Sequence, residues 1–409
     1  MKKKFYRTLK DSYFFLRVRG RNIRVVWYPK IKSEEVLIRE LCRAVWYLFP
    51  VKDRIRELIF VVDIEFINFD FKKVDVPEYL DSNIKKILIE FFDKISFRAT
   101  RKHIDKYDMQ VFWKGTDKLY YKKINKLYPY VVNTDFLINQ FEAIQLVRLS
   151  RLFISYKEKQ DSKIQLRHFL SFLKKQQKDV LLIGSGPSTV KIDYCDLDFS
   201  NTISIVCNSV VKNIDLLKKV NPSIIVASDS VFHSGYSKYA EEFRRSLIKA
   251  MKMFTSLVLI VPIKDYNIYK AVLPETVLSR LYCVESKRVK ALNMNLIKRT
   301  FVKSTNNILT LMMLPIASTI SKKIKLIGFD GKTKEDKDIF WKYNQDLQFT
   351  SIDSTKLGHP AFYRVDYQRY YEKHCSETEF AIEKILKKGI DVKSFCSSNI
   401  PILNKVSDK

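Results

Sequence analysis

The chain has 409 residues, a length that is sufficient for two domains. Of these residues 46% are hydrophobic and 13% aromatic, a composition that excludes a disordered polypeptide. A formal net charge of +29 favours anionic partners such as nucleic acid, anionic lipid, or charged glycans and nucleotides. No run approaches 18 uninterrupted apolar residues, so a transmembrane helix is not expected, and the basic start lacks the apolar core of a signal peptide.

The six cysteines also indicate the cellular compartment. They show neither a Cys-x-x-Cys motif nor a metal-ligand spacing, so reduced and partly buried thiols are expected in place of disulfides. Together with the missing signal peptide, this pattern predicts a cytoplasmic protein.

Residues 1–160 form the first expected region, which opens strongly basic. Helical periodicity runs through 36–48 and 84–92, whereas 58–66 is typical of a strand. We expect an α-rich mixed region whose basic, aromatic surface contacts an acceptor or a membrane face. A solvated basic face over an ordinary core is the alternative. The polar segment 157–178, rich in Lys and Gln, is expected to be a linker helix.

From residue 175 to the end, apolar runs alternate with helical stretches, which predicts a second domain over 175–409. Strands are predicted over 180–184, 203–207, 224–228, 256–262, 324–328 and 390–396. Helices are predicted over 210–220, 236–253, 306–321 and 376–388, the last with a capping box at Ser376 and Glu379 and a terminating Gly389. The alternation predicts an α/β class with a Rossmann-like, mostly parallel sheet and helices on both faces.

The segment Gly184-Ser185-Gly186-Pro187-Ser188, called the 184–188 loop, follows the first of these strands. Its glycines allow a sharp turn and a close approach of the backbone to a ligand. Pro187 and Ser188 suit the entry to a helical turn, where free N–H groups attract a phosphate. The loop lacks both the third glycine of the dinucleotide fingerprint and the Gly-Lys-Ser/Thr of a Walker loop.

Polar side chains follow nearly all of the other predicted strands. Asn208 follows the second strand, Asp229 the third, and Asp330 and Lys332 the strand over 324–328. Because the carboxyl ends of parallel strands meet at one edge, these residues predict a site for a polar ligand, in which Asn208 suits a base or ribose.

Two histidines lie close together near the end of the chain, His359 and His374, beside tyrosines that include Tyr371. A helix beginning directly after His374 would lower its pKa and favour the neutral imidazole that a general base needs. The alternative is a histidine that only packs against or caps the helix.

These residues resemble a known family. The carboxyl-terminal half, about 179–400, resembles the bacterial CMP-sialic-acid-dependent sialyltransferases that modify lipooligosaccharide, and it is similar to the related flagellin-modifying and MptE-like pterin kinase proteins. The family's Gly-Asn-Gly-Pro-Ser loop, which holds CMP, corresponds to the 184–188 loop. Its Cys-Asn strand end is matched by Cys207-Asn208, and its nucleotide-contacting Asn corresponds to Asp229.

The resemblance continues further along the chain. A Thr-Ser-Gly helix start in the family is replaced here by Thr305-Asn306-Asn307, and its Gly-Ile-Asp by Gly328-Phe329-Asp330. The family's catalytic His has a Tyr three residues before it, as His374 has Tyr371. Two family tyrosines that bind the leaving phosphate are not matched, and Lys332 stands near their positions.

The resemblance implies an inverting glycosyltransferase in lipopolysaccharide biosynthesis, which moves sialic acid or another nonulosonate from a CMP-sugar to lipooligosaccharide, O-antigen or capsule. The 184–188 loop, Thr305 and Asn306 would contact the nucleotide, with Asn208, Asp229 and Asp330. His374 would be the base, while Tyr371, Lys332 and His359 would offset charge on departing CMP, although His359 stays an alternative base.

Such a transfer requires no cofactor and no metal site, and Mg²⁺ is compatible but not essential. The expected partners are the CMP-sugar, a glycan or glycolipid acceptor and, peripherally, the anionic inner membrane. The alternatives are a pterin diphosphokinase that uses ATP and Mg²⁺, and a basic nucleic-acid-binding protein. No nucleic-acid partner is expected, because the Lys and Arg residues are spread without a recognisable binding motif. The oligomeric state stays open.

Overall fold

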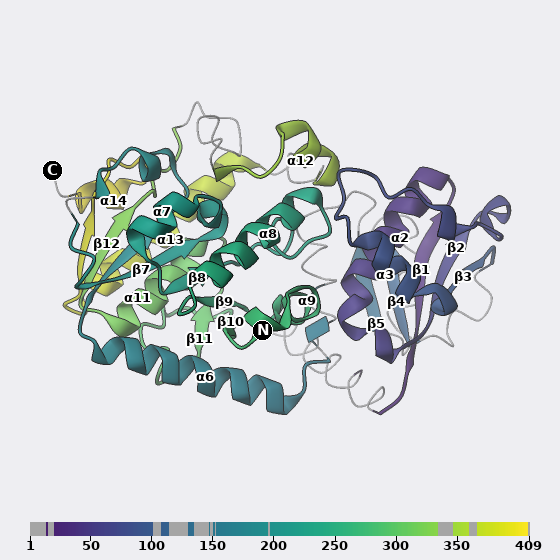
Figure 1. The fold of residues 1–409 in the computed structure, drawn as a ribbon, viewed down its shortest axis with the longest axis horizontal. Helices are drawn as coiled ribbons and strands as arrows, with labels where there is room; N and C mark the ends of the chain where they lie inside the picture. Colours follow the sequence, from purple (N-terminus) through teal and green to yellow (C-terminus); the bar gives the residue numbers. More distant parts are fainter. Residues whose placement is uncertain are drawn as a thin grey trace.

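The fold is known from a computed structural model, which describes residues 14, 20–100, 108–113, 130–134, 147, 150–151, 153–194, 197–333, 347–359 and 366–407. The basic start of the chain and Cys195 therefore lie outside the described residues. The described strands form two parallel sheets, one of five strands and one of eight (Figure 1). No helix in these described ranges is both long and apolar enough to cross a membrane.

The five-stranded sheet, with its helices, is called the first unit. Its strand order is β3-β2-β1-β4-β5, and every neighbouring pair is parallel. The strands are β1 (Ile23–Ile31), β2 (Ile55–Val62), β3 (Ile95–Arg98), β4 (Met109–Trp113) and β5 (Tyr130–Thr134). The helices are α2 (Glu34–Leu48) and α3 (Ile84–Glu90), with 3-10 turns η1 (Phe49–Arg54), η2 (Ile64–Phe66), η3 (Phe71–Lys73) and η4 (Phe92–Lys94).

The first unit has more strand than the sequence predicted. Of its five strands only β2 was expected, at 58–66, while the helices at 36–48 and 84–92 are confirmed. The others were missed because β3, β4 and β5 are only four or five residues long and β1 contains charged residues and a proline. These strands are buried by their pairing with neighbouring strands, and a segment this short has too few residues for its own sequence to show that burial.

The eight-stranded sheet, with its helices, is called the second unit. Its order is β11-β10-β9-β8-β7-β6-β12-β13, again with every neighbouring pair parallel. The strands are β6 (Asp179–Ile183), β7 (Thr202–Cys207), β8 (Ile224–Val226), β9 (Val258–Pro262), β10 (Leu281–Lys287), β11 (Phe301–Lys303), β12 (Lys323–Ile327) and β13 (Asp391–Ser394). The predicted α/β class is confirmed, with all six expected strands present and β10 and β11 added.

Helices cover both faces of this sheet. They are α6 (Tyr156–Lys175), α7 (Ile214–Val220), α8 (Lys238–Met253), α9 (Tyr266–Val272), α10 (Glu275–Leu278), α11 (Leu314–Ile320), α12 (Ile352–Gly358), α13 (Tyr367–Leu386) and α14 (Pro401–Lys405). Shorter turns are η6 (Pro187–Val190), η8 (Asn208–Lys212) and the π-helix η9 (Leu309–Met313). Alternate strand residues face the two layers: Val180 and Leu182 pack with α6, α11 and α13, whereas Leu181 and Ile183 pack with α7 and α8.

Helix α6 belongs to the second unit and is not a free linker. Ser155 caps its start through a capping box with Glu158. Leu166 and Leu170 are fully buried in the core beneath the sheet, and α6 runs along this unit in Figure 1. The expected helix is therefore confirmed, and its apolar stripe ties it to the sheet.

Helix α13 begins earlier than the sequence predicted. The capping box at Ser376 is wrong, because the helix starts at Tyr367, where the Asp366 carboxylate accepts the Arg369 N–H at 3.1 Å. Ser376 lies inside the helix and donates to the Glu372 carbonyl at 3.1 Å. Ser-x-x-Glu spacing also occurs within helices, so the motif alone did not fix the boundary. The terminating role of Gly389 is confirmed, with φ of +69°.

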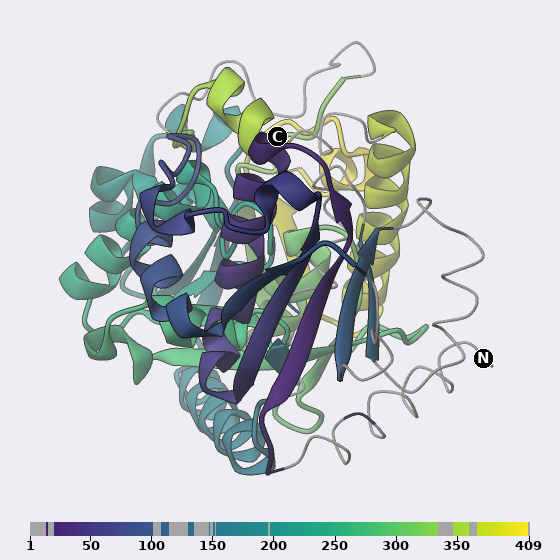
Figure 2. The same ribbon diagram turned by 90° about the vertical axis from the view of Figure 1, so that its right-hand side faces the viewer.

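Buried polar and aromatic contacts join the two units. Arg244 on α8 forms a buried ion pair with Asp81, and Trp46 on α2 donates to the Ser234 carbonyl at 3.0 Å. Phe232 lies in the same apolar core as the first sheet. Phe232 and Ser234 lie in the loop after β8, and Arg244 lies on α8, which this loop enters, so the carboxyl edge of the second sheet faces the first unit (Figures 1 and 2).

Candidate functional site

The strand order of the second unit contains a topological switch point. After β6 the chain adds β7 to β11 outward on one side, and then returns to place β12 and β13 on the other side of β6. The loops that follow β6 and β12 therefore leave the sheet beside each other at its carboxyl edge. Ligands of open parallel sheets bind in the crevice at this position. The 184–188 loop and the loop over 328–332 are the two segments involved.

These two loops pack backbone to backbone through their glycines. The Gly186 N–H donates to the Gly328 carbonyl at 2.9 Å. A Cβ atom on Gly184 would lie 2.3 Å from the same carbonyl oxygen, and one on Gly328 would lie 1.9 Å from the Thr189 hydroxyl. Gly328 also has φ of +77°. The glycines were predicted to permit a close ligand, and what they permit in the structure is a close neighbouring loop.

The Asp330 carboxylate lies at the start of η6. It accepts the Ser188 N–H at 3.1 Å and the Ser188 hydroxyl at 2.9 Å. Burial raises the pKa of Asp330 above its usual value, although these hydrogen bonds oppose the shift. The protein's own carboxylate therefore takes the position at which the sequence predicted a phosphate.

Asn208 presents an unsatisfied acceptor at the end of the neighbouring strand β7. Its backbone is left-handed, with φ of +49°, a conformation that Asn tolerates better than most residues. Its side-chain Oδ1 is buried and has no hydrogen-bond partner among the described residues. An orphaned buried acceptor costs free energy, which a ligand N–H or O–H would recover.

Tyr371 lies against the loop that follows β12. Its hydroxyl accepts the Lys332 N–H at 3.1 Å and donates to the Asn399 carbonyl at 3.1 Å. The Asn399 N–H in turn donates to the Asp330 carbonyl at 2.6 Å. As a whole residue, Lys332 is only 5% exposed. Tyr371 thus joins the loops after β12 and β13 to helix α13.

His374 lies one turn beyond Tyr371 on α13, with ring centroids 6.3 Å apart. The Thr378 hydroxyl is 3.4 Å from His374 Nδ1, and burial lowers the pKa of His374 to about 4. The expected cause was wrong: His374 lies seven residues after Tyr367, inside the helix, and not before a helix start. The neutral imidazole results from desolvation and not from the helix dipole.

Thr305 and Asn306 lie in the segment just before η9, beside α13. The Asn306 N–H donates to the Glu377 carboxylate at 3.3 Å, and its carbonyl accepts the Tyr370 hydroxyl. The Thr310 hydroxyl donates to the Thr305 hydroxyl at 3.0 Å. The structure therefore places this segment against the part of α13 that carries His374.

Two predicted residues lie elsewhere along the same edge. The Asp229 carboxylate accepts the Val231 N–H at 2.9 Å, so it shapes the turn after β8. His359 Nε2 lies 2.7 Å from the Ser237 hydroxyl, its ring packs 4.5 Å from that of Phe232, and burial lowers its pKa to about 3. Both residues contact the loop after β8, which is separated from β6 by β7.

Sequence reasoning missed a buried polar cluster formed by the loops that follow β8 and β9. The Asp265 carboxylate accepts the Ser234 hydroxyl at 3.2 Å and pairs with Lys264 at 3.3 Å. Lys264 also donates to the Ser230 hydroxyl, and burial raises the pKa of Asp265. The available signal was Lys264-Asp265 itself, which follows the predicted strand over 256–262 after one intervening residue, Ile263.

Two further findings bear on the kind of protein. Within the described part of the chain, no group of three or more His, Cys, Asp or Glu side chains is placed to hold a metal ion. No protein-family model, curated protein or solved structure matches this chain. The fold and the site define an α/β protein with a Rossmann-like parallel sheet and polar loops at its switch point.

Proposed function

We propose that this protein is an inverting glycosyltransferase, which moves sialic acid or another nonulosonate from a CMP-activated donor to a bacterial surface glycan. The observation that carries the proposal is the meeting of the 184–188 loop, Asp330 and Tyr371 at the switch point, with His374 one helical turn away. This is the edge at which parallel sheets bind nucleotides. The acceptor would be a glycan or glycolipid presented at the cytoplasmic side of the inner membrane.

Asn208 and Asp330 are the residues best suited to hold the nucleoside. The orphaned Asn208 Oδ1 would accept a hydrogen bond from an N–H donor such as the cytosine amino group. The Asp330 carboxylate is oriented by Ser188 and keeps lone pairs for ribose hydroxyls. Because Asp330 already uses the Ser188 N–H, the donor phosphate would bind nearer Lys332 and Tyr371 than the start of η6.

His374 would act as the base. With a pKa of about 4 it is neutral at pH 7, so its ring can accept the proton of the acceptor hydroxyl. That oxygen attacks the anomeric carbon while the bond from this carbon to the phosphate oxygen breaks, and CMP leaves with the electron pair. A bound phosphate beside the ring would raise the pKa of His374 towards neutrality and strengthen the base.

The test compares His374→Gln with His359→Gln, two buried histidines with lowered pKa. CMP binding is measured by calorimetry against UDP, GDP and ATP with Mg²⁺, and transfer from CMP-sialic acid is measured separately. We expect His374→Gln to lose about 100-fold or more in transfer rate while CMP still binds, and His359→Gln to lose less than about tenfold. Unfolding midpoints of both variants show whether each is folded.

Two results would overturn this proposal. The first is transfer by His374→Gln at the wild-type rate, which would show that His374 is not the catalytic base. The second is preferential binding of ATP with Mg²⁺ and no response to CMP, which would favour the pterin diphosphokinase alternative.

A further inference from the structure

A basic pocket opens at the edge of the second sheet opposite the switch point. Its volume is about 900 Å³. It is lined by the starts of β6 and β12, at Asp179 and Lys323, and by the segments that end α6, α11 and α13. Because all these strands are parallel, the pocket lies at the amino edge of the sheet. The five residues of β6 alone separate the two edges by about 16 Å.

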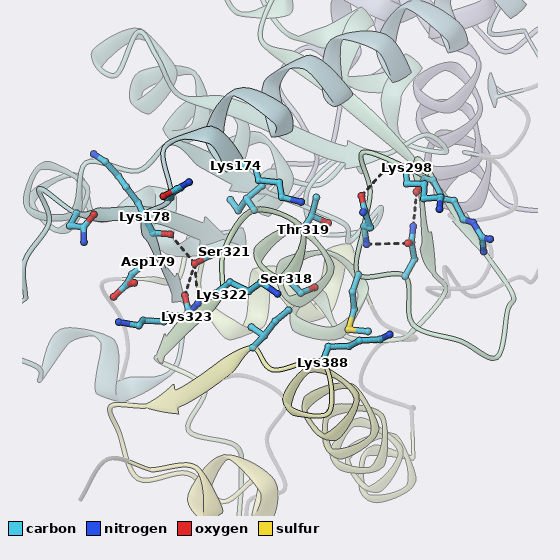
Figure 3. Close-up of a pocket in the computed structure, with 18 residues that line it drawn as sticks. Lys174, Lys178, Asp179, Lys298, Ser318, Thr319, Ser321, Lys322, Lys323 and Lys388 are labelled. Carbon is cyan, nitrogen blue, oxygen red and sulfur yellow. Dashed lines mark hydrogen bonds between the residues drawn. The ribbon is translucent and has the colours of Figure 1, made fainter.

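Positive charge dominates this pocket. Figure 3 shows lysines from several separate segments around the same cavity. The cationic lining residues are Lys174, Lys178, Lys298, Arg299, Lys322, Lys323 and Lys388. The one acidic lining residue, Asp179, is paired with Lys325 at 3.0 Å. Seven cations and one carboxylate give the lining a charge of +6, and within the described ranges none of the seven forms an ion pair.

The helix ends do not account for this charge. Three helices end at the pocket, and each carboxyl end carries a partial charge of about −0.5, so together they offset about 1.5 positive charges. An excess of about 4.5 positive charges is left. In addition, Lys298 and Arg299 lie on the loop between β10 and β11 and not at the end of a helix. A lysine cap on each helix would therefore explain only part of the cluster.

The walls that hold these cations are fixed by hydrogen bonds. The Asn293 side chain donates to the carbonyls of Arg299 and Phe301, both at 2.6 Å, and the Asn295 side chain accepts the Lys298 N–H at 3.0 Å. On the opposite wall, the Ser321 hydroxyl donates to the Lys178 carbonyl at 2.8 Å. Figure 3 shows both sets of bonds. The cations are therefore carried on ordered backbone, and a ligand would not have to order the loop first.

We propose that this pocket binds a molecule carrying clustered phosphate groups, at a site separate from the nucleotide crevice. Lysine is a common phosphate ligand, and several cations around one cavity match the charge of a polyphosphate better than that of a single carboxylate. The volume is in the range of small-molecule sites and exceeds what one phosphate ion fills. The phosphate groups belong either to a soluble phosphorylated compound or to lipid headgroups.

The experiment uses the full-length protein and two triple variants. The pocket variant is K298Q/K322Q/K388Q, and the control is K85Q/K86Q/K249Q, which replaces three exposed lysines away from the pocket. Both variants lower the net charge from +29 to +26. Binding of tripolyphosphate is measured by calorimetry, and binding to vesicles of phosphatidylglycerol and phosphatidylcholine by co-sedimentation. CMP binding and the unfolding midpoint are measured on each protein.

We expect the pocket variant to lose at least about tenfold in affinity for the phosphate probe, and the control less than about threefold, with binding weakened by salt in both. Binding of tripolyphosphate identifies a soluble ligand, whereas binding of vesicles alone identifies a lipid headgroup. Equal losses in the two variants would assign the effect to overall charge and overturn the proposal, as would a wild-type protein that binds neither probe. CMP affinity should be the same in all three proteins, so failure of the transferase proposal is recognised separately.

Discussion

Replacing Gly328 by alanine should destabilise the second unit through two separate costs. The first is backbone strain, since an alanine with φ near +77° costs about 1–2 kcal/mol. The second is steric, since the new Cβ would lie 1.9 Å from the Thr189 hydroxyl and 2.6 Å from the Gly184 carbonyl oxygen, which belongs to the backbone. Relieving such overpacking costs about 1–3 kcal/mol. Gly328→Ala should therefore lose about 2–5 kcal/mol of unfolding free energy.

Gly389→Ala is the matched control for this variant. Gly389 has φ of +69°, and no described heavy atom lies within 4 Å of its missing Cβ. It should lose only the strain of about 1–2 kcal/mol. Urea unfolding of both variants, followed by circular dichroism, measures the difference. Equal losses would show that the loops after β6 and β12 are not packed as closely as described. Gly328→Ala should also weaken CMP binding, whereas Gly389→Ala should not.

Three further predictions concern the interface, the core and pH. Asp81→Asn leaves the buried Arg244 without its carboxylate and should cost about 3–5 kcal/mol in urea unfolding, and a loss below 1 kcal/mol would contradict a buried pair. Leu170→Ala on α6 should lose about 2–5 kcal/mol of unfolding free energy, whereas Ile164→Ala, at a 48% exposed position, should lose less than about 1 kcal/mol. Similar losses in the two variants would contradict the packing of this face of α6 against the core. Because folding lowers the pKa of His374 from 6.5 to about 4, the unfolded chain binds this proton more readily, and stability present above pH 6.5 falls by about 3 kcal/mol as the pH drops to 4. In His374→Gln this part of the pH dependence, measured by urea unfolding across that range, should be absent.

Much of the second sheet was readable from the sequence. Buried parallel strands such as β6 and β7 are mostly apolar runs bounded by Gly, Asn or Asp, so each was recognised from its own residues. The polar residues after these strands were recognised for the same reason. The strands of the first unit were harder, because β3 and β4 are short and gain their burial only from their neighbours.

The candidate site was predicted in part. The sequence placed the 184–188 loop and Asp330 at one edge, since the carboxyl ends of parallel strands always share an edge. It did not show that Asp330 binds the amide of Ser188, because the two residues are 142 positions apart and meet only through the pairing of β6 with β12. The start of α13 was misplaced because a local Ser-Glu spacing does not show whether the tyrosine-containing segment before it is already helical.

By itself, the sequence determined six of the eight strands of the second unit, the residues that follow them, and that the chain is an α/β protein of high positive charge. These properties depend on local periodicity and composition, which each segment carries alone. Only the tertiary structure decided the strand order, and with it the switch point, the burial of His374 and the assembly of the basic pocket from α6, α11, α13 and the loop before β11. Strand order is set by how apolar faces pack across long stretches of chain, and no local pattern contains that information.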